Sequence, residues 1–97
     1  MRPYRFYPEA RAEAEAAAAF YETKQAGLGG RFVAALDDAV KRVRRNPSIY
    51  REMEGGLRQC RLLRFPFGVV FREQGSAIEI VAVIHIRREP GYWKGRT

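Results

Sequence analysis

The fold is decided by the stretch LRQCRLLRFPFGVVFREQGSAIEIVAVIHIRR at positions 57–88, which predicts three consecutive antiparallel strands. The first strand is expected over 57–65 and the second over 69–72, after a turn at 66–68. The third is expected over 78–86, after a turn in which Gly75 can adopt a positive φ. This third strand is the most apolar run of the chain and is rich in β-branched residues, which is typical of a strand in the middle of a sheet.

Two helices are predicted before this stretch, with a short strand at 3–7 ahead of them. The first helix covers 9–25, because an Ala-rich run favours helix and Pro8 is tolerated at a first helical position. Its acidic residues are expected on the outer, solvated face: Glu13, Glu15 and Glu22. Glycines at 27, 29 and 30 end this helix.

The second helix is expected over 30–45 and ends before Pro47, which disfavours helix at the preceding residue. Phe32, Leu36 and Val43 follow helical spacing and form an apolar stripe. The short connection makes the two helices an antiparallel hairpin. The predicted fold is therefore α+β: an N-terminal strand, a helical hairpin, and a three-stranded antiparallel meander with the helices on one sheet face. All 97 residues are expected to form a single domain.

Composition indicates a cytoplasmic protein. No stretch approaches the roughly 20 apolar residues of a membrane span, and the first residues carry no apolar segment of signal-peptide length. The single cysteine, Cys60, rules out an internal disulfide and fits a reducing compartment. No cluster has the spacing of a metal site, and no cofactor is expected.

The net charge of +7 lies mainly in the second half of the chain, where residues 57–97 carry eight basic and three acidic side chains. This excess favours an anionic partner, either nucleic acid or an acidic peptide, although a solvated basic surface accounts for it equally well. In the first meander strand we expect Leu63 and Phe65 to face the helices. Arg58 and Arg64 would then point to the open face of the sheet.

Five short motifs in this order resemble the RelE/ParE superfamily of type II toxins, which includes plasmid stabilisation proteins. They are Phe20-Tyr21-Glu22, Gly27-Leu28-Gly29-Gly30-Arg31-Phe32, Asn46-Pro47, Arg64-Phe65-Pro66-Phe67 and the segment from Val83 to Trp93. The resemblance covers essentially the whole chain. It implies a small growth inhibitor held silent by a cognate antitoxin. Some family members resemble ribosome-dependent endoribonucleases that cut messenger RNA, whereas others poison DNA gyrase without catalysis.

The residues at the family's catalytic positions favour the gyrase-directed alternative. Cleaving members carry lysines on the first meander strand and an arginine at the start of the second, where this chain has Cys60, Leu62 and Gly68. Without these cations a metal-free nuclease would lose several kcal/mol of transition-state stabilisation. His85 is the residue that could restore proton transfer, together with Arg87 and Tyr92. A degenerate member without potent activity is the third alternative.

Two groups of residues are candidate contacts. The expected target contacts combine arginines with large aromatics, as interface hot spots do: Arg58, Arg64, Arg87, Arg88, Tyr92 and Trp93. In this group, Trp93 could instead fold back to cap the core. The expected antitoxin contacts are the apolar stripe Phe32, Leu36 and Val43. A disordered antitoxin segment would fold across this stripe on binding.

Overall fold

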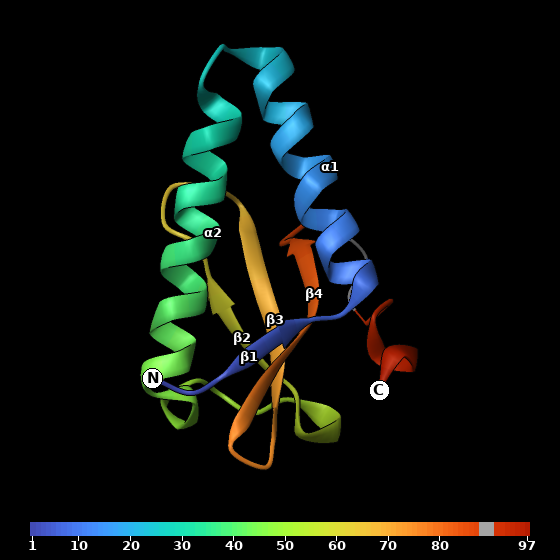
Figure 1. Cartoon of the computed structure of the whole chain (residues 1–97). Coiled ribbons are helices and arrows are strands. Elements are labelled where there is room, and N and C mark those ends of the chain that lie inside the picture. Colours follow the sequence, from blue (N-terminus) through green and yellow to red (C-terminus); the bar gives the residue numbers. More distant parts are fainter. Residues whose placement is uncertain (88–90) are drawn as a thin grey trace.

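The computed structural model describes residues 1–87 and 91–97. Its element order is β1 (Tyr4–Phe6), α1 (Pro8–Lys24), α2 (Leu28–Arg45), β2 (Arg58–Arg61), β3 (Phe67–Gln74) and β4 (Ala77–His85). Short 3-10 turns follow α2 and end the chain. The two helices form a long hairpin that lies across the sheet and extends beyond it (Figure 1). The predicted α+β fold is confirmed.

The four strands are ordered β1-β4-β3-β2, with β4 between its neighbours as its apolar sequence predicted. β1 is parallel to β4, and β2, β3 and β4 form an antiparallel meander. The register shifts by one residue between Val70 and Phe71, which pair with Ala82 and Ile80 respectively. Val81 is therefore the extra residue of a β-bulge.

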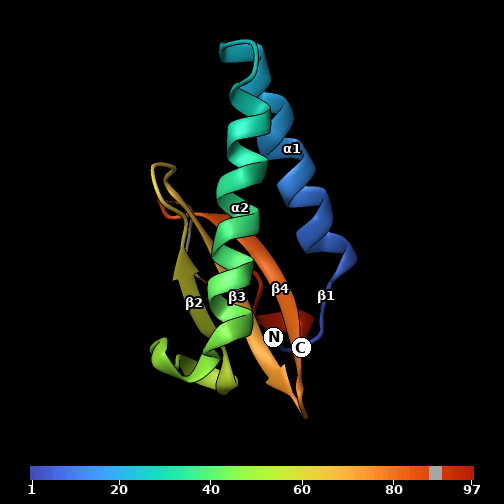
Figure 2. The same cartoon turned by 60° about the vertical axis from the view of Figure 1, so that its left-hand side comes forward.

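The helices cover one face of the sheet (Figure 2). The buried side chains of α1 and α2 belong to one core cluster, which also contains Val69, Phe71 and Ile80 from the sheet. The hairpin is tight at its tip, because a Cβ on Gly29 would lie 2.7 Å from the carbonyl oxygen of Ala18. Glu22 is exposed, as predicted, and it also accepts hydrogen bonds from the amides of Gly27 and Gly29 at the start of α2.

The first meander strand is shorter than predicted and presents the opposite face. It ends at Arg61, because Arg64 has a φ of 69° and the chain turns before Phe67. Cys60 and Leu62 pack in the helix-side cluster, while Leu63 is 61% exposed. The expectation that Leu63 faces the helices is therefore wrong, although Phe65 does pack against the helix-side cluster from the turn.

The second face of the sheet is covered as well, by the end of the chain. Trp93 is 5% exposed and packs in a second cluster with Leu57, Val70, Val81, Ala82 and Ile84. The indole therefore caps the core from the side that the helices leave uncovered. The expectation of an open sheet face is wrong at this position.

A buried carboxylate, Glu79, ties the N-terminal residues to the second sheet face. It is 4% exposed and accepts hydrogen bonds from Arg5 Nε at 2.9 Å, Arg72 Nε at 2.8 Å and the Tyr7 hydroxyl at 3.0 Å. Burial raises the pKa of the Glu79 carboxyl, but the hydrogen bonds from Arg5, Arg72 and Tyr7 outweigh burial and lower this pKa to about 2.

This depressed pKa predicts acid sensitivity. Between about pH 4.5 and pH 2 the unfolded chain binds a proton at Glu79 that the folded chain does not, so the free energy of unfolding falls as the pH falls through this window. A Glu79→Gln variant should lose part of this dependence and be less stable at pH 7. Urea titrations of the parent and the variant at several pH values measure the free energy of unfolding and its pH dependence. Exposed Glu15→Gln is the control, and an identical pH dependence in parent and Glu79→Gln would refute the role of this carboxyl.

Candidate functional site

The C-terminal residues that the sequence singled out do not form one exposed patch. Arg87 is exposed, and its side chain has no ion-pair partner among the described residues. Tyr92 is 37% exposed, whereas Trp93 is buried. Arg88 lies outside the described residues. Within this group, the alternative that Trp93 caps the core is the one that the structure confirms.

A clamp formed by Glu13 of α1 and Arg96 holds this segment in place. Arg96 donates to both carboxylate oxygens of Glu13 at 2.9–3.0 Å and to the carbonyl of Val81 at 3.0 Å. Glu13 also accepts the amide of Val83 at 3.0 Å and the hydroxyl of Tyr92 at 2.9 Å. β1 pairs with β4 only as far as Ile80, so the clamp takes the place of a neighbouring strand along the next residues of β4.

The clamp was not predicted from the sequence, which placed Glu13 on the outer face of its helix. Burial raises the pKa of the Glu13 carboxyl, but hydrogen bonds from Arg96, the Val83 amide and Tyr92 lower it by more, so the net shift is downward. Glu13 and Arg96 are 83 positions apart in sequence. No local pattern indicates such a pairing.

Removing Arg96 should release the C-terminal segment from the sheet. Trp93 is the sole tryptophan, so its fluorescence reports the segment directly. In an Arg96→Ala variant we expect the emission maximum to shift to longer wavelength as the indole becomes hydrated, while the circular dichroism of the helices is kept. Lys94→Ala, which removes an exposed ion pair to Glu54 at 3.6 Å, is the control and should leave the emission unchanged. An unshifted Arg96→Ala spectrum would show that the clamp does not hold Trp93.

His85 ends β4 on the wall of a groove of about 360 Å³, which Phe20 of α1 and Phe67 of β3 also line. Its Nδ1 accepts the backbone amide of Arg87 at 3.1 Å, so Nε2 is the atom left to exchange a proton. Glu13 lines the same groove, but both its oxygens already accept hydrogen bonds. The structure thus brings His85 and the Arg87 backbone together, and no carboxylate of residues 1–87 or 91–97 bonds to the histidine ring.

Cleaving family members carry cations at three positions where this chain has Cys60, Leu62 and Gly68. The structure shows that these three residues cannot take over the role of the cations. Cys60 is 1% exposed and Leu62 is 5% exposed, and both belong to the helix-side core. Burial raises the pKa of the Cys60 thiol, as expected of a packing residue. At Gly68 a Cβ would lie 2.7 Å from the Gln59 side chain, so Gln59 covers this position.

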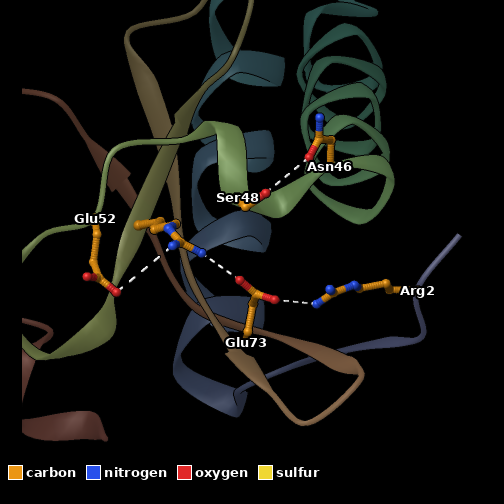
Figure 3. A network of polar contacts seen from close by, with 6 residues as sticks. Arg2, Asn46, Ser48, Glu52 and Glu73 are labelled. Carbon is orange, nitrogen blue, oxygen red and sulfur yellow. Dashed lines mark hydrogen bonds and ion pairs between the residues drawn. The ribbon is translucent and has the colours of Figure 1, made fainter.

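Arg58 lies in an ion network, and Arg64 is exposed in the turn between β2 and β3. Arg58 is two residues before Cys60 in β2, so both side chains point to the sheet face that the helices cover. The prediction that Arg58 points to the open face is therefore wrong. It pairs with Glu73 and lies 4.0 Å from Glu52, and Glu73 also pairs with Arg2 (Figure 3). The network joins the N-terminal residues, the loop after α2 and the sheet.

The predicted antitoxin stripe is not a free surface. Phe32 and Val43 are fully buried and Leu36 is 7% exposed, because all three pack against the sheet. The expectation that they remain exposed is therefore wrong. The large apolar side chain that is exposed in this part of α2 is Val33, at 52%.

Two classes of site are not found in the described part of the chain. It contains no group of three or more His, Cys, Asp or Glu side chains that could hold a metal ion. None of its helices is long and apolar enough to cross a membrane.

Comparison with known proteins identifies the family. No match was found among curated protein sequences. A solved structure described as the chromosomal ParDE toxin–antitoxin system from P. aeruginosa matches with a TM-score of 0.65 and 23% identity, over 88% of this chain and 96% of that one, which shows a shared fold. The family model for the ParE toxin of the type II toxin–antitoxin system parDE matches residues 4–90. The chain therefore belongs to the ParE toxin family of type II toxin–antitoxin systems.

Proposed function

We propose that this protein is a growth inhibitor that acts on DNA gyrase by protein–protein contact, without catalysis of its own. Family membership supports the toxin role and implies an antitoxin partner. The observation that carries the choice of mechanism is the burial of Cys60 and Leu62, at the positions where cleaving relatives carry lysines. A side chain in the helix-side core cannot stabilise the charge of a phosphorane on the surface.

The exposed guanidinium of Arg87 is the proposed anchor of the target contact. Arginine is enriched among interface hot spots, and this one has no intramolecular ion pair among the described residues to break on binding. Arg64 is exposed in the same way, whereas Arg58 would first have to leave its network with Glu73. Tyr92 and Trp93 contribute by holding the C-terminal segment against the sheet.

The alternative activity, cleavage of ribosome-bound messenger RNA, would use His85 with Arg87 and Tyr92. His85 is partly exposed at the end of β4, but the Tyr92 hydroxyl is hydrogen-bonded to Glu13. Both targets are cytoplasmic, so we propose that the protein acts there. Supercoiling by purified gyrase and cleavage of ribosome-bound message, measured side by side, distinguish the two activities, and inactivity in both assays would identify a degenerate member.

A further inference from the structure

Phe20 is a large aromatic residue that the core does not bury. All six phenylalanines lie within the described residues, and Phe20 is the one that is exposed, at 54%. It lies on α1, and Nζ of Lys24, one turn further along the helix, is 4.9 Å from the centre of its ring. Because aromatic side chains are enriched among interface hot spots, an exposed phenylalanine beside a cavity is a candidate contact.

The cavity beside Phe20 is the groove of about 360 Å³ that His85 also lines. We call it the α1–β4 groove. The rings of Phe67 and His85 meet edge to face at 5.1 Å on its sheet side, and Ala16, a small residue, lines its helix side. The volume is at the lower end of the roughly 300–1,000 Å³ that ligand clefts span, so the groove suits a side chain and not a whole helix.

Positive charge lies at both ends of the α1–β4 groove. Lys24 is one turn beyond Phe20, and Arg87 follows His85 by two residues and is exposed. No ion pair within residues 1–87 and 91–97 involves Lys24 or Arg87. The carboxylate that lines the groove, Glu13, is neutralised by Arg96 at 2.9 Å. The groove therefore complements an apolar side chain that has acidic neighbours.

The groove is built for side-chain contacts and not for an added strand. On the adjacent edge of β4, the amide of Val83 already donates to Glu13 at 3.0 Å, and the carbonyl of Val81 already accepts from Arg96 at 3.0 Å. A partner strand would have to displace the Glu13–Arg96 clamp before it could pair with these two backbone groups. A side chain that enters beside Phe20 leaves the clamp in place.

We infer that the α1–β4 groove belongs to the gyrase contact and receives an apolar side chain from a gyrase segment with acidic residues on either side. The apolar side chain packs against Phe20 and Phe67, and the acidic residues pair with Lys24 and Arg87. This inference rests on the proposed function. The groove is assigned to gyrase because it is continuous with Arg87, the proposed anchor of that contact, and Phe20 becomes a second hot spot.

The test compares purified variants for inhibition of plasmid supercoiling by DNA gyrase. Phe20→Asp should raise the half-inhibitory concentration at least about 30-fold, as expected for the loss of a hot spot. Val33→Asp is the matched control, because Val33 is 52% exposed on the other helix and the change in net charge is the same. This control should stay within about threefold of the parent. Affinity for the antitoxin encoded by the adjacent reading frame is measured in parallel.

Parent-like inhibition by folded Phe20→Asp, or an equal loss in Val33→Asp, would overturn the inference and leave the proposed function standing. If Phe20→Asp inhibits gyrase like the parent but no longer binds the antitoxin, the groove belongs to the antitoxin instead. Should circular dichroism show that Phe20→Asp is unfolded, Ala16→Trp replaces it, because Ala16 is exposed on the groove and the indole would fill the space. A parent chain that does not inhibit gyrase overturns both the inference and the proposed function.

Discussion

Replacing Ile80 with aspartate should abolish folding. Ile80 is fully buried in β4, where it pairs with Phe6 on one side and Phe71 on the other and packs against the helices. The substitution removes apolar burial worth about 2–5 kcal/mol and places an unpaired carboxylate in the core, which costs several kcal/mol more. A domain of this size has about 5–15 kcal/mol of stability in total, so the folded state should no longer be populated.

Far-UV circular dichroism and thermal melting measure this effect. Ile49→Asp is the matched control, because Ile49 is 66% exposed and the same change there should leave the melting temperature nearly unaltered. A soluble Ile80→Asp protein that melts cooperatively would show that β4 is not the centre of the sheet.

Charge reversal at Arg87 should abolish toxicity, whereas His85→Gln should preserve it. Loss of a hot-spot arginine costs about 2 kcal/mol or more in binding, which is about 30-fold in affinity. Glutamine keeps much of the shape and hydrogen bonding of His85 but removes its titratable group. If His85 were a general base, this change would reduce the rate about 10²–10⁴-fold and toxicity would nearly vanish.

Growth arrest on induction without antitoxin measures both variants, with circular dichroism to confirm that each one folds. Arg51→Glu is the control, because Arg51 is also exposed and makes no ion pair among the described residues. Trp93 is unsuitable for this comparison, since truncating a residue buried against Ile84 and Val70 would disturb folding as well as contact. A folded, non-toxic His85→Gln variant beside a toxic Arg87→Glu variant would contradict the proposed mechanism.

Periodicity was sufficient to predict the helices and the central strand. The β-branched run of β4 is typical of a central strand, and the apolar spacing of α2 is typical of a helix with one apolar face. The first meander strand carries no such signal, because arginine and apolar residues occur on both of its faces. Its true orientation is set by the positive φ of Arg64 and by packing of Cys60 and Leu62 under the helices.

The site was harder to predict because its contacts join distant parts of the chain. The Glu13–Arg96 clamp and the Arg2–Glu73–Arg58 network depend on strand order, which decides whose side chains meet. The apolar stripe of α2 was correctly identified as one face. A sequence pattern alone does not distinguish a face that packs on its own sheet from one that awaits a partner, and Phe32 and Val43 do the former.

The most direct test of the proposed mechanism is a single experiment with purified toxin in two assays. One assay measures supercoiling of relaxed plasmid by DNA gyrase, and the other measures cleavage of messenger RNA on translating ribosomes, each with the parent, Arg87→Glu and Arg51→Glu proteins. We predict that the parent and Arg51→Glu inhibit supercoiling, that Arg87→Glu does not, and that none cuts the message. Cleavage of ribosome-bound message by the parent, with supercoiling unaffected, would contradict it.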